Sequence, residues 1–205
     1  MRYFLFFLIP IFVFAKVYSV DEYKRSFYNL SLKQQRILYE IYQGAAKYNM
    51  SWTCAAIAWQ ESYAGEIRIK PDDGKHGSCG VMHNLLDSVF SRHPEWVKTK
   101  NNYNRICTQL MLNNSFSLME AIDEINYWKK RRKKWIDIWA SYNGGWKYKS
   151  KKAQDYAKNI RNRIKAMFLI IGHEWDQGFM EFRDGRRIKK WNKMLYFPSK
   201  KNNYR

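Results

Sequence analysis

The stretch Ser51-Trp-Thr-Cys-Ala-Ala-Ile-Ala-Trp-Gln-Glu61-Ser62 contains the helical pattern on which the predicted fold depends. Four of its positions recur at the helical spacing i, i+3, i+4 and i+7: Cys54, Ile57, Ala58 and Glu61. Glu61 therefore shares a helix face with an apolar stripe. Burial disfavours the charged form of a carboxyl group, and a carboxyl that stays protonated can donate a proton. Spacing alone still favours the plainer interpretation, an exposed glutamate at a helix end.

Helix signals recur along the rest of the chain. Residues 31–34 (Ser-Leu-Lys-Gln) and 117–120 (Ser-Leu-Met-Glu) have the form of capping boxes, which open helices, and the glycine pair at 144–145 predicts a helix stop. We predict helices over about 31–45, 51–65, 84–91, 103–112, 117–128, 135–140 and 153–171, a polar loop over 66–81, and a hairpin turning at Asp184-Gly185. The predicted fold class is mainly α, with one helical domain over 30–172 and a short basic, aromatic C-terminal extension over 173–205.

The N-terminus has the composition of a secretory signal peptide. Arg2 precedes an apolar run that reaches Ala15. This run is short for a transmembrane helix and has the length of a signal-peptide core. The small residues of Val13-Phe-Ala15 predict cleavage after Ala15, with Ser19 as the second choice. We therefore expect residues 1–15 to direct export, and an uncleaved membrane anchor is the alternative.

The three cysteines, Cys54, Cys79 and Cys107, allow at most one intramolecular disulfide. Cys54 lies on the apolar helix face, where a thiol usually behaves as a small buried hydrophobe. In an exported protein, Cys79 and Cys107 are therefore the better pair. The four histidines are scattered and have no zinc-site spacing, so we predict no metal site and no cofactor.

The chain is strongly basic, with 37 Lys and Arg against 18 Asp and Glu in 205 residues and a formal net charge of +19. Such a surface attracts polyanions, which include nucleic acid, anionic lipid and an acidic cell wall. The densest basic run is Lys-Lys-Arg-Arg-Lys-Lys at 129–134. A solvated surface is our first interpretation of this run, and attraction to wall carboxylates or anionic lipid is the second. The export signal and the lack of a recognised DNA-binding motif argue against nucleic acid as a partner.

Four short motifs follow one another in a fixed order. They are Glu61-Ser62 at a helix end, Gly80-Val-Met-His83, Ala140-Ser-Tyr-Asn-Gly-Gly145, and Tyr156-Ala-Lys-Asn-Ile160. Over about residues 35–170 this set resembles the soluble lytic transglycosylase domain, a family of the lysozyme-like superfamily. Each motif is weak alone, and the ordered set is fairly specific. Within that family, the chain looks most like the compact, single-domain members associated with envelope-spanning secretion machines.

The resemblance implies a role for each matching residue. Glu61 would be the only catalytic acid and base. Ser62 would hydrogen-bond near the scissile sugar, and Met82 would form a wall of the cleft. Tyr142 and Asn143 would shape the sugar subsite beside the catalytic carboxyl.

Two further positions complete the implied site. The Tyr156 hydroxyl would lie near the Glu61 carboxyl. His83 stands where the family usually has Gln, and an imidazole lacks the paired hydrogen bonds of an amide. This departure puts the substrate contact of His83 in doubt and leaves the reaction itself unaffected. The second glycine of the pair, Gly145, is a milder departure, since the family more often has Ala before it.

The reaction that the resemblance implies is cleavage of the β-1,4 bond between N-acetylmuramic acid and N-acetylglucosamine in peptidoglycan. Glu61 would protonate the leaving oxygen, and the substrate's own N-acetyl group would stabilise the positive centre. Glu61 would then take the proton of the muramic acid 6-hydroxyl, which gives a 1,6-anhydro product without metal or cofactor. We expect a periplasmic monomer that acts on glycan strands, with a secretion, pilus or flagellar assembly as a candidate partner.

Two other functions stay open on the sequence. A hydrolytic, goose-type lysozyme has the same fold and would need a carboxylate that activates water. Asp72 and Asp73 could approach Glu61 from the intervening loop, although a solvated turn is the favoured interpretation of this pair. A catalytically silent, cationic wall-binding or membrane-binding protein would release no cell wall, and Glu61 would then have no chemical role.

Overall fold

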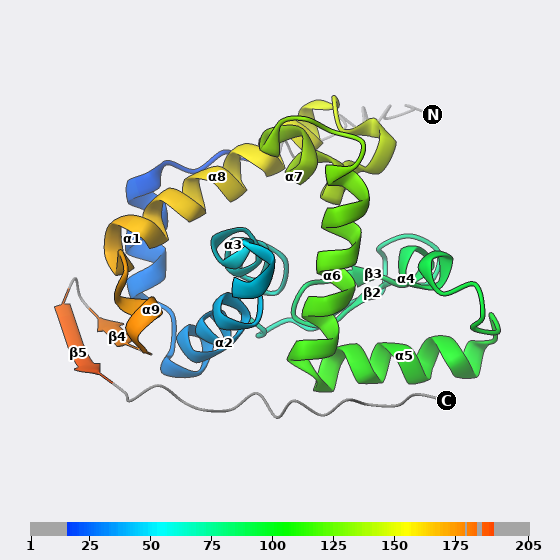
Figure 1. The fold of residues 1–205 in the computed structure, drawn as a ribbon, viewed down its shortest axis with the longest axis horizontal. Coiled ribbons are helices and arrows are strands. Elements are labelled where there is room, and N and C mark those ends of the chain that lie inside the picture. The colour runs from blue at the N-terminus through cyan, green and yellow to red at the C-terminus, as the bar shows by residue number, and fades with distance from the viewer. Residues whose placement is uncertain (1–15, 179, 184–185, 191–205) are drawn as a thin grey trace, which may run out of the picture.

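The computed structural model describes residues 16–178, 180–183 and 186–190, and its fold is mainly α, as the sequence predicts (Figure 1). The predicted signal peptide at 1–15, the Asp184-Gly185 turn and residues 191–205 of the predicted extension lie outside the described residues. None of the described helices is long and apolar enough to span a membrane.

A large lobe is built around helix α3 (Ser51–Ser62), in which every residue from Thr53 to Trp59 is buried. The helices around it are α1 (Val20–Tyr28), α2 (Leu32–Gly44), α6 (Asn114–Lys129), α7 (Trp135–Gly144), α8 (Lys151–Ile171) and α9 (Glu174–Gln177). Figure 1 shows α2, α6 and α8 on three different sides of α3. A helix that is apolar all round becomes the centre of a core, so the apolar stripe of the sequence belongs to a helix that is enclosed on all sides over residues 53–59.

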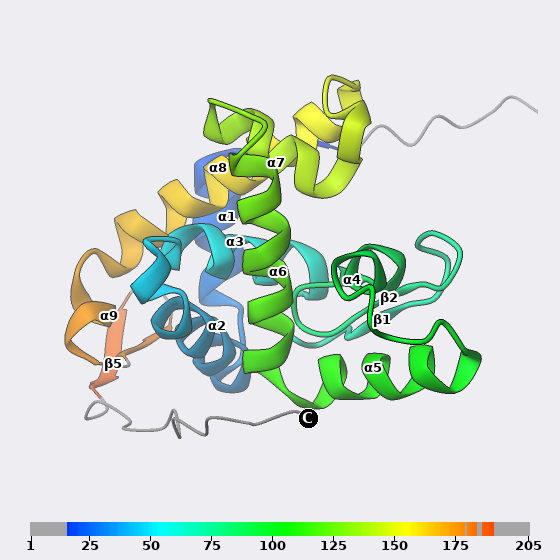
Figure 2. The same cartoon turned by 45° about the vertical axis from the view of Figure 1, so that its right-hand side comes forward.

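A small lobe lies on the other side of α6 (Figure 2). It consists of β1 (Ile69–Lys70), β2 (Ser78–Cys79), β3 (Asn84–Leu85), α4 (Leu86–Arg92) and α5 (Lys100–Leu112), and its strands pair antiparallel in the order β1-β2-β3. The lobe has its own apolar cluster, which includes Phe90 and Leu110. The disulfide Cys79–Cys107 joins β2 to α5 with an S–S distance of 2.01 Å, which confirms the predicted pair. Cys54 is free and buried in the large lobe.

The predicted capping box at residues 117–120 is wrong, because α6 begins at Asn114. The side chain of Asn113 caps that helix by accepting the N–H of Phe116. Ser117 is therefore inside α6 and buried, and its hydroxyl is used by the small lobe instead. The box at 31–34 is confirmed, since the Ser31 and Gln34 side chains bond each other's backbone N–H groups.

Other elements are longer than predicted or were not predicted. Helix α7 reaches Gly144, and a short 3-10 turn, η2 (Gly145–Lys147), follows it. Another 3-10 turn, η1 (Ala46–Tyr48), precedes α3. Helix α1 had no predicted counterpart, although Ser19 and Glu22 form a capping box at its start. The predicted hairpin is confirmed, with β4 (Met180–Arg183) antiparallel to β5 (Arg186–Lys190).

The core extends past both ends of the domain predicted over 30–172. Phe27 of α1, Trp175 of α9 and Phe182 of β4 belong to the same apolar cluster as α3. Their rings pack at interplanar angles of 52° and 63°, with centroids 6.3 Å apart for Phe27–Trp175 and for Phe27–Phe182. Part of the predicted C-terminal extension therefore contributes to the core.

Candidate active site

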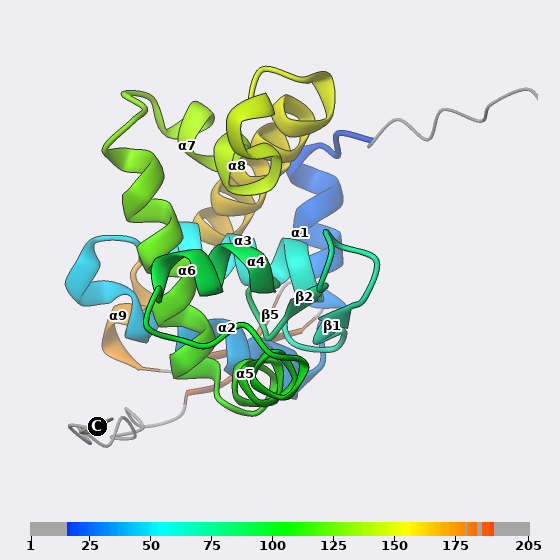
Figure 3. The same cartoon turned by 90° about the vertical axis from the view of Figure 1, so that its right-hand side faces the viewer.

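A cleft of about 520 Å³ lies where the two lobes face each other. Figure 3 looks from the side of the small lobe and shows α4 in front of α3, with α7 above. The cleft is lined from both lobes by Glu61, Lys70, Asp73, His83, Asn84, Leu85, Ser88, Ser91, Arg92, Glu124, Tyr127, Trp128, Ser141, Tyr142, Asn143, Gly145 and Trp146. Four of the residues predicted for the site, including Glu61, therefore meet in one place.

Glu61 stands in the last turn of α3 and turns its carboxyl into this cleft. Its side chain is only 12% exposed. No Lys or Arg among the described residues forms an ion pair with it, and His83 Nδ1 lies 3.6 Å from Glu61 Oε2. That separation is longer than a hydrogen bond, so the carboxyl is enclosed without being fixed by a cation.

His83 lines the cleft, and a backbone contact fixes its ring. Its side chain is 4% exposed, and its Nε2 lies 2.8 Å from the carbonyl oxygen of Ile67. A carbonyl only accepts hydrogen bonds, so Nε2 carries the proton and donates it. Nδ1 of a neutral ring then presents a lone pair toward Glu61, and it has no hydrogen-bond partner among the described residues.

Two tyrosines enclose the other side of the Glu61 carboxyl. Burial raises the pKa of Tyr156 well above its ordinary value of 10.0, and the charge of the nearby Glu61 raises it further. The Tyr156 hydroxyl is buried without a hydrogen bond of ordinary geometry among the described residues. Burial and Glu61 likewise raise the pKa of Tyr142. Both phenols therefore remain protonated at neutral pH and present neutral, polar groups to the carboxyl.

Ser62 and Met82 support the cleft from behind and do not line it. Both are fully buried. The Ser62 hydroxyl donates to the carbonyl of Val81 at 2.7 Å and accepts the N–H of Gly65 at 2.8 Å. The Met82 carbonyl accepts a hydrogen bond from the Tyr142 hydroxyl at 2.9 Å. These contacts tie the end of α3 to the segment that carries His83.

Gly80 allows the segment of residues 80–83 to approach α6 closely. Its φ is +88°, and a Cβ at this position would lie 2.5 Å from Ser117 Oγ and 2.7 Å from the Leu110 carbonyl. A side chain has no room there, and the left-handed conformation favours glycine. The Ser117 hydroxyl receives the N–H of Met82 at 3.2 Å and the amide of Asn84 at 2.9 Å. The glycine of the motif is thus required by contact between the lobes.

Asn143 and Tyr142 lie in the last turn of α7 rather than in the turn after it, because the helix ends at Gly144. Asn143 is exposed and lines the cleft. Gly145 follows with φ of +55°, a conformation that ends the helix. The pair of glycines therefore stops the helix as predicted. The helix itself reaches Gly144, one turn past the predicted last residue, Ala140.

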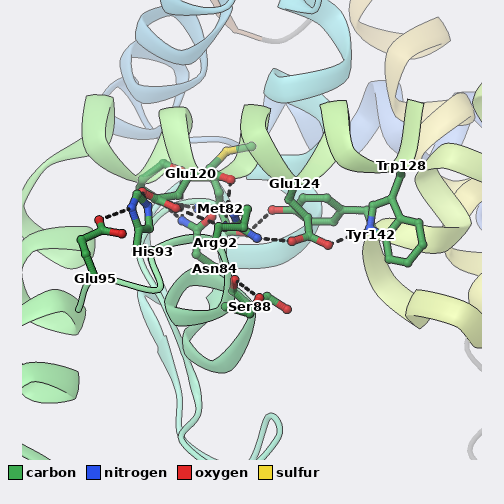
Figure 4. Close-up of polar contacts among 12 residues, drawn as sticks. Met82, Asn84, Ser88, Arg92, His93, Glu95, Glu120, Glu124, Trp128 and Tyr142 are labelled. Carbon is green, nitrogen blue, oxygen red and sulfur yellow. Dashed lines mark hydrogen bonds and ion pairs between the residues drawn. The ribbon is translucent and has the colours of Figure 1, made fainter. Parts of the chain in front are cut away.

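The opposite wall of the cleft holds a second carboxylate, which the sequence analysis missed. Glu124 of α6 accepts a hydrogen bond from Trp128 Nε1 at 2.7 Å, and its other oxygen pairs with Arg92 of α4. Arg92 also binds Glu120 at 3.1 Å, and Figure 4 shows the guanidinium between the two carboxylates. His93 contacts the far oxygen of Glu120 at 2.8 Å.

This cluster joins the lobes, since α4 and α6 belong to different ones. The two glutamates are four residues apart on α6, which places them on one face of the helix. That spacing is a signal which could have identified them, but the misplaced capping box assigned Glu120 to a helix start. Of the loop aspartates, Asp73 lines the cleft and Asp72 is exposed.

Glu61 is a carboxyl that can deliver or accept a proton, and it lies largely enclosed on the cleft wall with no described Lys or Arg partner. Within the described residues, no group of three or more His, Cys, Asp or Glu side chains is placed to hold a metal ion. No protein-family model, curated protein or solved structure matches this chain.

Proposed function

We propose that the protein is a peptidoglycan lytic transglycosylase with a lysozyme-like fold. The observation that supports this most is the placement of Glu61, a nearly enclosed carboxyl on a cleft wall, next to Tyr142 and Tyr156 and unpaired with any described Lys or Arg. A general acid of a glycosidase needs such an environment, because it must hold a proton until the leaving oxygen takes it.

The proposed reaction uses Glu61 twice. Glu61 first donates its proton to the glycosidic oxygen, and the C1–O bond breaks. The substrate's N-acetyl group stabilises the positive charge that develops at C1. The Glu61 carboxylate then removes the proton of the muramic acid 6-hydroxyl, whose oxygen bonds to C1. The proton that Glu61 lost is restored, no water is consumed, and no metal or cofactor takes part.

The surrounding residues have positioning roles in this proposal. Tyr142 and Asn143 are on the cleft surface where a sugar would lie, and Tyr156 faces the carboxyl from within the core. Ser62 and Met82 hold the backbone behind the cleft rather than touching sugar. His83 has one nitrogen occupied by Ile67, so its free nitrogen serves Glu61 and not the substrate.

A hydrolytic lysozyme is the second candidate, and Glu124 on the opposite wall favours it. Such an enzyme needs a carboxylate that takes a proton from water. Both oxygens of Glu124 already accept hydrogen bonds from Arg92 and Trp128, which leaves it poorly available as a base. Transglycosylation, which needs only Glu61, is therefore preferred.

Mass spectrometry of purified sacculi digested by the mature protein tests the proposal. We expect soluble fragments that end in 1,6-anhydromuramic acid, and none from the Glu61→Gln variant. Reducing ends would establish hydrolysis instead. Release that is equal for the wild type and for Glu61→Gln would favour a silent wall-binding protein and contradict the proposal.

The place of action follows from the same proposal. A peptidoglycan substrate and the predicted signal peptide both indicate the periplasm as the site of action. The Cys79–Cys107 disulfide can also form in that compartment. We propose a monomer, because one chain supplies both walls of the cleft. An envelope-spanning secretion, pilus or flagellar assembly that needs a gap in the wall is the partner implied by the family resemblance.

A further inference from the structure

The basic run at residues 129–134 forms a corner between α6 and α7, and we call it the basic corner. Its members are Lys129, Lys130, Arg131, Arg132, Lys133 and Lys134. Five of the six are exposed, and none forms an ion pair with an acidic side chain in the described part of the chain. Six adjacent cations repel one another, and a bound anion would relieve that repulsion.

Aromatic rings hold this corner in a defined shape. The Arg132 guanidinium lies over the rings of Tyr148, Trp146 and Trp128, at 4.0, 5.2 and 5.3 Å from their centroids. Its Nε also donates to Ser141 Oγ at 3.1 Å. Stacking of this kind is favourable for a guanidinium, so the corner is an ordered surface rather than a loose basic tail.

The basic corner is continuous with the cleft. Tyr127 lines both the cleft and a neighbouring hollow of about 660 Å³, whose other residues are Asp123, Asn126, Lys129, Lys130 and Arg131, three cations against one carboxylate. Trp146 is 67% exposed and also lines the cleft. A chain that leaves the cleft over Tyr127 and Trp146 therefore reaches the cations directly.

We propose that the basic corner is a binding site for polymer-bound carboxylates, namely the acidic peptide stems of the glycan strand whose sugars occupy the cleft. This inference rests on the proposed function. In this proposal the neutral sugar backbone lies in the cleft, and the negatively charged peptide stems of the glycan bind to the basic corner. Charge supports that division, because the cleft lining carries both signs, with Glu61, Asp73 and Glu124 beside Lys70 and Arg92, whereas all six residues of the basic corner are cations.

The other polyanions fit this surface less well. A nucleic acid passing from the corner into the cleft would move its phosphates from a wholly basic surface to a lining of mixed charge, where Arg92 is already paired with Glu124. A membrane surface would be expected to take up free aromatic rings. Here Arg131 covers Tyr127 at 3.5 Å, and Lys129 lies 5.5 Å from the ring centre of Trp135. These two rings are covered by cations, and the largely exposed ring of this surface, Trp146, lies on the cleft side, where a glycan chain would pass.

Binding of the Glu61→Gln protein to two insoluble substrates tests the inference. One is intact sacculi, and the other is chitin, an insoluble and uncharged polymer of N-acetylglucosamine that carries no peptides. The test variant is Lys130→Gln/Lys133→Gln/Lys134→Gln. The matched control is Arg25→Gln/Arg161→Gln/Lys165→Gln, which removes three exposed cations from α1 and α8. Thermal unfolding of each variant checks that the fold is kept.

We expect intact sacculi to be bound about tenfold or more tightly than peptide-free glycan, since each basic residue near an anionic surface adds to affinity. The corner variant should lose this preference, and the control variant should keep it. Equal affinity for the two substrates, or equal loss in both variants, would overturn the inference. So would a larger loss, in the corner variant, of binding to duplex DNA or to phosphatidylglycerol vesicles than of binding to sacculi.

These outcomes are separate from those of the proposed function, because the Glu61→Gln protein binds without cleaving. Wild-type protein that releases no anhydro or reducing ends would contradict the proposed function while the binding preference could still be read. Conversely, a wild type that cleaves normally and a corner variant that keeps its preference for intact sacculi would remove the inference alone.

Discussion

Each of the two walls of the cleft presents a glutamate. The glutamate on one wall has no cationic partner among the described residues, and the glutamate on the other has both oxygens hydrogen-bonded. On the acid wall, formed by α3 and α7, Glu61 faces the lone nitrogen of His83 at 3.6 Å and has no described Lys or Arg partner. On the ion-pair wall, formed by α4 and α6, Glu124 has one oxygen bound to Arg92 and the other to Trp128. A carboxyl with both oxygens occupied supports structure, and one without such donors is available for proton transfer.

The largest effect that we expect is a loss of stability when the ion-pair wall loses its arginine. Arg92→Met removes the partner of Glu120 and Glu124 and leaves the buried carboxylate of Glu120 without its guanidinium. Removal of one partner from a buried ion pair costs about 3–5 kcal/mol, so we expect that loss in the free energy of unfolding. Urea unfolding followed by circular dichroism measures it, with Lys98→Met as an exposed control. An equal, small change in both variants would show that the cluster does not join the lobes.

The next effect concerns the loop that carries both His83 and Arg92. The Cys79–Cys107 disulfide closes this loop, with a sequence separation of 28. Its removal in Cys79→Ser/Cys107→Ser should lower the free energy of unfolding by about 3 kcal/mol, mainly because the unfolded chain gains freedom. A thiol reductant should destabilise the wild type by a similar amount and leave the double variant unchanged. A reductant effect on the double variant would contradict this explanation.

A smaller loss is expected on the acid wall for Tyr142→Phe. This variant deletes the hydroxyl that donates to the Met82 carbonyl at 2.9 Å and leaves that carbonyl without the bond. A buried polar group left unpaired costs about 1–2 kcal/mol. Thermal unfolding should report that cost. A variant as stable as the wild type would indicate that water replaces the lost donor.

The smallest stability effect at neutral pH is expected for Tyr156→Phe, because its buried hydroxyl has no hydrogen bond of ordinary geometry to lose. Its raised pKa adds a pH dependence. The stability gained by keeping this phenol protonated is fully present below the ordinary value of 10.0 and is lost as pH rises above it. Urea unfolding at pH 7 and at about pH 11 should show less alkaline destabilisation in the variant. An identical pH response in both proteins would contradict the raised pKa.

The sequence predicted the features that depend on local pattern. The capping box at 31–34, the glycine stop at 144–145 and the buried face of α3 follow from short-range spacing, and the structure confirms them. The choice of Cys79 and Cys107 was also correct, since it needed only the apolar position of Cys54. The family resemblance predicted that Glu61, Tyr142 and Asn143 belong to one site, and all three line one cleft.

What the sequence could not supply depends on contacts between distant segments. Ser117 matched a capping pattern, but its hydroxyl is satisfied by Met82 and Asn84 from the other lobe, and no local rule includes those partners. Glu124 has no recognised motif, and only the approach of α4 to α6 makes it part of the cleft. Gly80 had an assigned place in a motif, whereas its steric reason, Ser117 at 2.5 Å, appears only in three dimensions.

We propose that Glu61, and not Glu124, transfers the proton. Initial rates of sacculus solubilisation by Glu61→Gln and Glu124→Gln, measured side by side with the wild type, test it most directly. We expect Glu61→Gln to lose about 1,000-fold or more, since a group that acts as both acid and base is removed, and Glu124→Gln to stay within about tenfold of the wild type. Full activity in Glu61→Gln, or complete loss in Glu124→Gln with Glu61→Gln still active, would contradict the claim.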